Sequence, residues 1–306
     1  MPTSWKGRNI ISTNELSKAD MLYVLKVAEE LKKKPQPNLL RGFVMGSCFF
    51  EPSTRTRLSF ETAMQRLGGT VVGFADPAVT SVKKGETLSD TAQIVSQYAD
   101  VIVMRHALEG APRYASEVIK KPVINAGDGG NQHPTQGLLD LFTIKECQKK
   151  IDGLHIAIIG DLKYGRGIHS LVQTLKHFNV RLYLVAPTEV QLPEAFRSEL
   201  KQAGIKFSLH DTFEQLIPNL DIIYLIRMQE ERFLDRLEYE RLKHTFFLKL
   251  SMLEKAKPSM RILHIMPRVC EMDTAIDATP HAYYFQEAQN GLYVRQALLA
   301  LVLGKI

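Results

Sequence analysis

Apolar residues along this chain form short continuous runs, and most runs are followed by polar residues and then by helical spacing. This alternation predicts parallel strands that are buried on both faces and connected by helices. The expected strands of the first half lie at 43–50, 70–75, 101–105 and 122–127. Those of the second half lie at 155–161, 181–187, 206–210, 221–226 and 261–266.

Helical spacing is clearest at 15–34, where Pro35 ends the pattern. The apolar stripe of this expected helix consists of Leu22, Leu25, Val27, Ala28 and Leu31. The basic run 32–34 is read as a solvated helix end rather than a nucleic-acid contact. The other expected helices lie at 53–67, 87–99, 135–149, 167–178 and 286–303.

These elements form two series, one on each side of the helix expected at 135–149. The chain has 306 residues, which fits two domains of about 150 residues each. We therefore predict an α/β protein of two domains, each a mostly parallel sheet flanked by helices. The boundary between them is expected within that helix.

Composition narrows the possible functions. Apolar residues make up 45% and charged residues 24% of the chain, the balance of a soluble globular protein. We expect no secretory signal and no membrane span, because no apolar run is long enough. The three cysteines are scattered, so we expect neither a disulfide framework nor a metal site, and a cytoplasmic location. The formal charge of +6 is not gathered into a stripe, which favours anionic small molecules over nucleic acid.

The segment STRTR directly follows the first apolar run. If a helix begins at Ser53, the free N–H groups of its first turn and its dipole favour a phosphate at the strand's end. The hydroxyls of Ser53, Thr54 and Thr56 and the guanidinium of Arg55 would add donors. Because Arg57 lies about 200° around the helix from Arg55, only one of the two arginines is expected to bind ligand. The alternative is an ordinary serine N-cap with exposed arginines.

Further donors lie at other expected strand ends. Arg105 ends a strand, where parallel sheets bind ligands. His133 and Gln136 open a helix after a glycine-rich loop and lie on nearly the same side of it. A surface arginine and a helix cap are the alternatives for these residues. Donors at three strand ends together favour a site for an anion and a carbonyl oxygen.

Two polar loops carry basic residues. The loop 81–90 contains Ser81 and Lys84, and it could equally be an exposed surface loop. The loop 160–170 superficially resembles a dinucleotide-binding turn, but its glycines lack the GxGxxG spacing. Groups suited to carboxylates follow strands of the second half: Arg166, Arg227 and Gln229.

Together these motifs resemble the carbamoyltransferases, the family of aspartate and ornithine carbamoyltransferases. STRTRLSFE, KGET, VMRH, HPTQ, GDLKYGR, RMQEER and MPR occur in the family's order and spacing over essentially the whole chain. The likeness is greatest to bacterial, aspartate-using catalytic chains that pair with a separate regulatory subunit. It implies that the C-terminal helix returns to the first domain. The implied carbamoyl-phosphate domain is then 1–134 with 287–306, and the aspartate domain 135–286.

The resemblance also implies a reaction, in which carbamoyl phosphate and L-aspartate give N-carbamoyl-L-aspartate and phosphate in pyrimidine biosynthesis, without a cofactor. The implied carbamoyl-phosphate contacts are Ser53, Thr54, Arg55, Thr56, Ser81, Lys84, Arg105, His133, Gln136, Met266 and Pro267. The implied aspartate contacts are Lys84, Arg166, Arg227 and Gln229. The residues implied in catalysis are Arg55, Thr56, Lys84, Arg105 and His133. Ser81 and Lys84 would come from the neighbouring chain of a homotrimer, which could join regulatory chains in an allosteric dodecamer.

The chain departs from the family's usual pattern at three places. Gly167 stands where Thr is usual, Cys270 stands at an acidic position, and HIMPR replaces HPLPR. Losing the first proline of that segment is expected to loosen the turn at Met266.

Two other functions compete with transfer to aspartate. Ornithine carbamoyltransferases share the phosphate half, but they carry SMG where this chain has Arg227–Gln229, and Cys where it has Ile265. Arginines suit a dicarboxylate rather than ornithine. A catalytically silent assembly subunit is the second alternative, and the complete set of donors argues against it.

Overall fold

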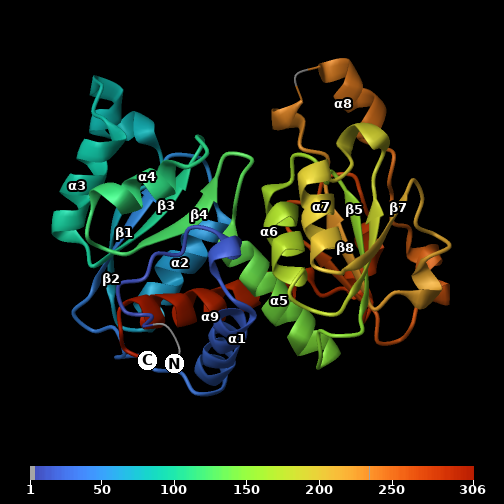
Figure 1. The fold of residues 1–306 in the computed structure, drawn as a ribbon, viewed down its shortest axis with the longest axis horizontal. Coiled ribbons are helices and arrows are strands. Elements are labelled where there is room, and N and C mark those ends of the chain that lie inside the picture. The colour runs from blue at the N-terminus through green and yellow to red at the C-terminus, as the bar shows by residue number, and fades with distance from the viewer. Residues whose placement is uncertain (1–3, 234) are drawn as a thin grey trace. The chain divides into compact units, whose positions relative to one another are not determined.

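The structure is a computed structural model that describes residues 4–233 and 235–306. The chain divides into two compact units. The first unit is Met1–Leu139 with Gln289–Ile306, and the second unit is Asp140–Ala288. Both boundaries fall inside helices, α5 (Pro134–Gln148) and α9 (Tyr284–Val302). Each unit contains its own parallel sheet (Figure 1).

The sheet of the first unit has the strand order β2-β1-β3-β4, and all its pairings are parallel. Its strands are β1 (Val44–Phe49), β2 (Thr70–Phe74), β3 (Val101–His106) and β4 (Val123–Asp128). Its helices are α1 (Lys18–Lys33), α2 (Arg55–Arg66), α3 (Leu88–Tyr98) and α4 (Ala111–Val118). The order reverses between β1 and β3, which is where such sheets bind ligands.

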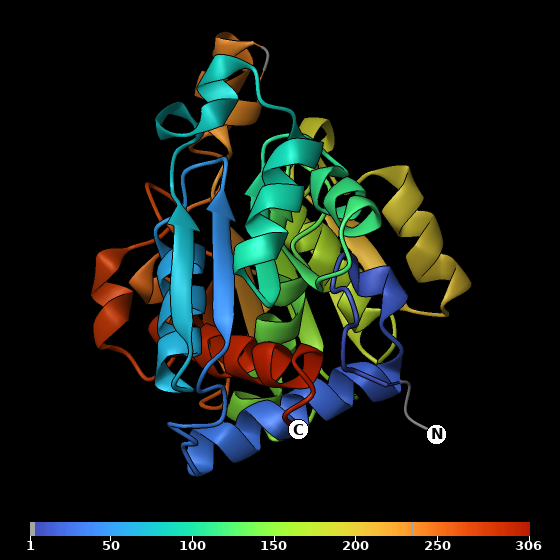
Figure 2. The same cartoon turned by 90° about the vertical axis from the view of Figure 1, so that its left-hand side faces the viewer.

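Helices cover both faces of this sheet. Gly46 of β1 lies against α3, where a Cβ atom would come within 2.9 Å of Val95. The next residue, Ser47, faces the other way and donates its hydroxyl to Glu61 of α2, at 3.0 Å. The final helix α9 belongs to this unit from Gln289 onward. It lies beside α1, where Lys32 Nζ is 2.9 Å from Asn290 Oδ1 (Figure 2).

The sheet of the second unit has the order β7-β6-β5-β8-β9, again parallel throughout. Its strands are β5 (His155–Gly160), β6 (Arg181–Val185), β7 (Lys206–His210), β8 (Ile222–Ile226) and β9 (Arg261–His264). Its further helices are α6 (Arg166–Leu175), α7 (Glu194–Gln202) and α8 (Arg236–Leu242). Here the order reverses between β5 and β8. The loops that leave these two strands therefore start side by side.

The predicted fold class is confirmed: both sheets are parallel and flanked by helices, and the C-terminal helix returns to the first unit. Every predicted strand is present. The helices α4, α7 and α8 were not predicted, because they are short and the longer patterns obscured them. No helix among the described residues is long and apolar enough to cross a membrane.

Two details of the predicted helices were wrong. Leu22 of α1 is 37% exposed, and Met21 and Val24 are buried instead. The helix expected from Ser53 begins two residues later, at Arg55, and the side chain of its N-cap residue Thr54 forms no capping hydrogen bond. A helix start without a side-chain cap leaves backbone N–H groups available to an anion.

Candidate functional site

Two pairs of predicted residues meet in the first unit, at the carboxyl ends of β1, β3 and β4. The buried hydroxyl of Thr56 lies 3.4 Å from Nε2 of His133, a side chain only 4% exposed. Nη1 of Arg105 lies 3.4 Å from Oγ of Ser53. Hydroxyl, imidazole and guanidinium groups at the ends of adjacent strands can donate hydrogen bonds to an anion or a polarised carbonyl oxygen.

The backbone explains why these side chains are positioned as they are. Phe49 of β1 pairs with Arg105 of β3, so α2 and the β3 loop leave the sheet side by side. His133 directly precedes Pro134, which opens α5, and its carbonyl accepts the backbone N–H of Gln136 at 2.9 Å. Proline suits the first turn of a helix, because its missing N–H would have no partner there.

Acidic partners of the two arginines were not predicted from the sequence. Arg105 Nε lies 2.9 Å from Glu51 Oε2. Arg57 pairs with Glu61 on its own helix, at 3.2 Å. Arg57 therefore has a partner on its own helix, and Arg55 is exposed. The binding role of Arg55 stays a prediction.

Three further predicted residues of this unit lie apart from those pairs. Thr54 is the N-cap residue of α2 and is exposed. Ser81 and Lys84 lie on an exposed 3-10 turn, Ser81–Lys84. Among the described residues, no hydrogen bond or ion pair joins the side chains of this turn to Arg105 or His133. Their predicted role in a neighbouring chain's site stays a prediction.

Three of the four predicted aspartate contacts follow β5 and β8 in the second unit: Arg166, Arg227 and Gln229. Gly160 pairs with Ile226, so Arg166 and Arg227 follow adjacent strands. Arg227 forms two hydrogen bonds with Glu231, at 2.5 and 3.0 Å. Burial is the largest single influence on Glu231 and opposes its ionisation. The hydrogen bond and charge of Arg227, a backbone hydrogen bond and the charge of Arg232 together outweigh burial and lower the pKa of that carboxyl group.

Gln229 carries an unused donor. Its Nε2 atom is buried and has no hydrogen-bond partner among the described residues. A buried amide without an acceptor is costly, by about 1–3 kcal/mol, unless a ligand completes it. This orphaned group is what a binding residue for a carboxylate would present.

Asp161 joins the loop after β5 to the loop after β8. The sequence analysis did not single out this residue. It is fully buried at the end of β5, and it accepts the backbone N–H groups of Tyr164 at 2.9 Å and Gln229 at 3.3 Å. Burial raises the pKa of Asp161 to about 6, although these backbone hydrogen bonds oppose the shift. A polar residue immediately after an apolar strand was the available signal in the sequence.

Met266 and Pro267 follow β9, and Met266 has a positive φ of 55°. A non-glycine residue in this conformation is uncommon and is often found at functional sites. The backbone here, rather than the side chain, is therefore the distinctive feature.

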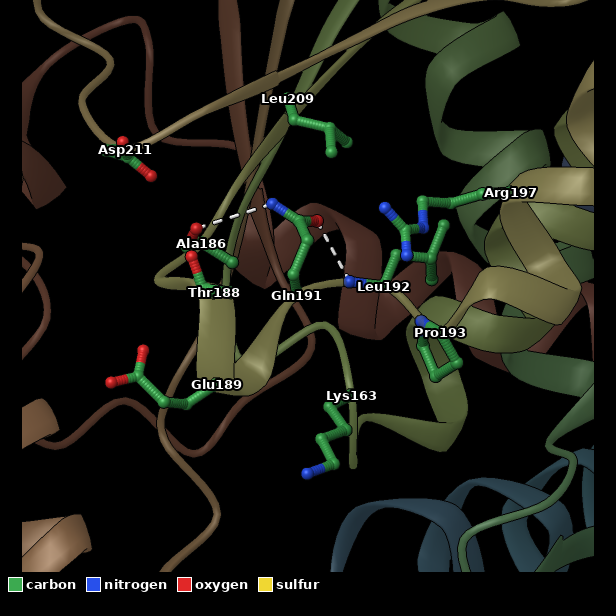
Figure 3. Close-up of a pocket in the computed structure, with 10 residues that line it drawn as sticks. All are labelled: Lys163, Ala186, Thr188, Glu189, Gln191, Leu192, Pro193, Arg197, Leu209 and Asp211. Carbon is green, nitrogen blue, oxygen red and sulfur yellow. Dashed lines mark hydrogen bonds between the residues drawn. The ribbon is translucent and has the colours of Figure 1, made fainter.

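A pocket of about 300 Å³ opens elsewhere in the second unit, at the carboxyl ends of β6 and β7 (Figure 3). It is lined by Lys163, Arg197 and Asp211 together with apolar and polar neighbours, and none of the predicted substrate contacts is among the described residues that line it. Within the described part of the chain there is also no cluster of three or more His, Cys, Asp or Glu that could hold a metal ion.

Comparison with known proteins decides the family. Residues 8–146 match "Aspartate/ornithine carbamoyltransferase, carbamoyl-P binding domain", and residues 152–302 match "Aspartate/ornithine carbamoyltransferase, Asp/Orn binding domain". The chain belongs to the aspartate/ornithine carbamoyltransferase family. The resemblance inferred from the motifs is thereby confirmed.

Relatives within the aspartate/ornithine carbamoyltransferase family are similar over nearly their whole length. The aspartate carbamoyltransferase catalytic subunit of Vibrio campbellii is 54% identical, covering 100% of this chain and 99% of its own. That of Bacteroides fragilis is 52% identical over 98% of this chain and 97% of its own.

Solved structures agree in fold. The aspartate transcarbamoylase of Trypanosoma cruzi in complex with carbamoyl phosphate and aspartate is 37% identical, with a TM-score of 0.93 and 98% of each chain covered. The catalytic subunit of the M. jannaschii enzyme is 45% identical, with a TM-score of 0.90, covering 97% of this chain and 98% of that one.

Proposed function

We propose that this protein is an aspartate carbamoyltransferase, which transfers the carbamoyl group of carbamoyl phosphate to L-aspartate in pyrimidine biosynthesis. The observation that carries the proposal is the pairing of Thr56 with His133 beside the uncapped start of α2. Membership of the family, and full-length relatives that are aspartate carbamoyltransferases, support the choice of substrate.

The first unit would bind carbamoyl phosphate. The phosphate would accept hydrogen bonds from the first turn of α2, from Arg55 and from the Ser53–Arg105 pair. Thr56, His133 and Arg105 would then stabilise the oxyanion that forms when the carbonyl carbon is attacked. Fixed donors of this kind are often the largest catalytic contribution, and removing one commonly costs about 10²–10³ in rate.

The second unit would bind aspartate, because a dicarboxylate needs two cationic partners. Arg166 and Arg227 would supply them, and the orphaned amide of Gln229 would complete the contact. A substrate carboxylate would replace Glu231 as the partner of Arg227, so binding exchanges one ion pair for another.

The chemistry needs no covalent nucleophile. The neutral α-amine of aspartate attacks the carbonyl carbon, the bond from that carbon to the phosphate oxygen breaks, and the departing phosphate can accept the amine proton. Holding both anions in place makes their encounter effectively unimolecular.

A homotrimer with Ser81 and Lys84 shared between chains, a larger assembly with regulatory chains, and a cytoplasmic location belong to the same proposal. The exposed Ser81–Lys84 turn supports sharing, since it lies open to a neighbouring chain. Three cysteines without a disulfide partner are compatible with a reducing compartment.

The test is a product assay with carbamoyl phosphate and either aspartate or ornithine. Carbamoyl-aspartate should form, and Arg55→Ala should lower its rate by about 10²-fold or more without unfolding the chain. Arg66→Ala, at the other end of α2, is the matched control and should change the rate little. Citrulline without carbamoyl-aspartate would reverse the assignment of the substrate.

A further inference from the structure

Two buried acidic side chains meet behind the turn that follows β9. Glu287, in the first turn of α9, is 2% exposed, and its Oε2 accepts the backbone N–H of His264 at 2.8 Å. Asp140 of α5 is fully buried, and its side chain is within hydrogen-bonding range of Glu287. All three residues belong to the second unit.

Burial and the neighbouring carboxyl group of Asp140 both disfavour a negative charge on Glu287. The other oxygen of Glu287, Oε1, is buried without a hydrogen-bond partner, and no cation pairs with Glu287 among the described residues. Two neighbouring carboxyl groups in such surroundings share one proton, because their repulsion and desolvation both oppose a second charge.

The hydrogen bonds indicate which acid carries the proton. The hydroxyl of Tyr224 donates to Oδ2 of Asp140 at 2.9 Å, which stabilises Asp140 as the carboxylate. Glu287 receives only the one backbone N–H. Burial, and then the charge of Asp140, raise the pKa of Glu287 well above its ordinary value. A proton on Glu287 would be donated to Asp140.

Glu287 thereby anchors a turn that is otherwise held by His264. The Nδ1 atom of His264 accepts the N–H of Met266 at 2.8 Å, so the proton of the ring lies on Nε2 and is donated to Glu271 at 2.6 Å. Glu271 also accepts the N–H groups of Val269 and Cys270. The looseness expected from the missing proline is countered by these hydrogen bonds.

We propose that Glu287, in its protonated form, is a positioning residue that fixes the turn His264–Pro267 through the backbone of His264 while donating to Asp140. The consequence for catalysis rests on the proposed function, in which the backbone of Met266 and Pro267 contacts the carbamoyl group. If Glu287 loses its proton, it repels Asp140 and the turn moves.

Substitutions separate this role from simple packing. Glu287→Gln keeps a neutral donor for Asp140 and an acceptor for His264, so kcat/KM for carbamoyl phosphate should stay within about twofold. Glu287→Leu removes the hydrogen bonds to Asp140 and His264. This variant should lower kcat/KM for carbamoyl phosphate by about 10- to 100-fold, because small displacements at a reacting group slow the reaction strongly. Gln286→Glu, on the exposed neighbour, is the matched control and should behave as wild type. Equal losses in the Gln and Leu variants would overturn the proposal.

Two measurements do not depend on activity. Infrared difference spectra between wild type and Glu287→Gln at neutral pH should contain the carbonyl band of one protonated carboxylic acid. Its absence would overturn the proposal. If carbamoyl-aspartate never forms, the proposed function fails, but this band still decides whether the acid pair exists.

Urea unfolding supplies the second measurement. A carboxyl pKa raised in the folded state gives stability that is present below the unfolded value of 4.5 and is lost as the pH rises through the folded value. Between about pH 5 and about pH 8, the unfolding midpoint of wild type should therefore fall relative to Glu287→Gln. Parallel curves would overturn the proposal.

The comparison with Glu287→Gln is necessary because other titratable groups lie near Glu287. Those from the elements packed around it are Asp140, Glu146, Cys147, Tyr224, Arg261, His264, Glu271 and Tyr283. They are the same in both proteins, so the difference between the two curves reports Glu287 together with the Asp140 that is coupled to it.

Discussion

At the scale of single residues, the site depends on which side chains already have partners. Thr56 and His133 contact one another, whereas Arg227 is paired with Glu231 and would exchange that partner for a substrate. A partly buried arginine that is paired with an acid destabilises the folded chain less than an unpaired one, because a buried unpaired charge is unfavourable. In the proposed function, the side chain that would bind the substrate therefore already forms an ion pair in the free protein.

Asp161 gives a prediction at this scale. Asp161→Asn would turn one acceptor of backbone N–H groups into a donor, which disturbs Tyr164 and Gln229. We expect KM for aspartate to rise about tenfold with a smaller change in kcat, as measured by steady-state kinetics. An unchanged KM would contradict the positioning role of Asp161.

The same residue predicts a pH effect with a definite sign. Below about pH 6 the wild-type carboxylate gains a proton and loses acceptor strength, so KM for aspartate should rise relative to its value at neutral pH. Stability should change in the opposite direction, because a raised carboxyl pKa favours folding at acid pH and this contribution is lost as the pH rises through about 6. The Asp161→Asn variant lacks this titration, and a wild type that follows the same pH curve as the variant would contradict the assignment.

At the scale of elements, the site requires close packing between β5 and β8. Gly160 ends β5 with a φ of +125°, and a Cβ atom there would lie 1.9 Å from the carbonyl oxygen of Ile226. Only glycine allows the two strands to stay paired up to the point where their loops diverge. The loops that carry Arg166 and Arg227 therefore depend on this glycine.

Gly160→Ala should consequently lower the free energy of unfolding by about 3 kcal/mol or more and raise KM for aspartate. The matched control is Gly204→Ala, where φ is +73° and no atom lies within 4 Å of a Cβ. In that variant the free energy of unfolding should fall only by the cost of holding an alanine in the left-handed conformation, about 1–2 kcal/mol. Equal unfolding free energies in the two variants, measured in urea, would show that the strand contact is unimportant.

At the scale of the whole molecule, the predicted site includes a lysine, Lys84, that lies on the exposed Ser81–Lys84 turn. In the described part of the chain, the Lys84 side chain bonds to none of the other predicted phosphate contacts. Sharing of the site between chains would supply the missing cation. The excess positive charge of the chain would then attract the two anionic substrates.

Subunit mixing tests this sharing. Arg55→Ala and Lys84→Ala chains should each be inactive alone, because each lacks one part of every site. After dissociation and reassembly together, some sites would combine an intact Arg55 with an intact Lys84 from a neighbour, and activity should return in part. No recovery in verified mixed assemblies would contradict sharing.

Local sequence patterns were enough to predict the two parallel sheets, which the fold confirms. They also indicated a site at the strand ends, and the roles of its residues stay predictions. Apolar runs and helical spacing are local patterns, and buried parallel strands produce them directly. The motif STRTR likewise indicated an anion site, because hydroxyls and arginines directly after a buried strand are typical of one. Short helices such as α4 were missed because eight residues give too little periodicity.

The long-range partners of the buried acids became visible only in the folded chain. Asp161 could be assigned to Gln229, and Asp140 to Glu287, only once distant segments were placed together. Burial and hydrogen bonding set the protonation of such groups, and both depend on neighbours far away in the chain. A sequence pattern shows that an acid is present, but its charge is a property of the folded surroundings.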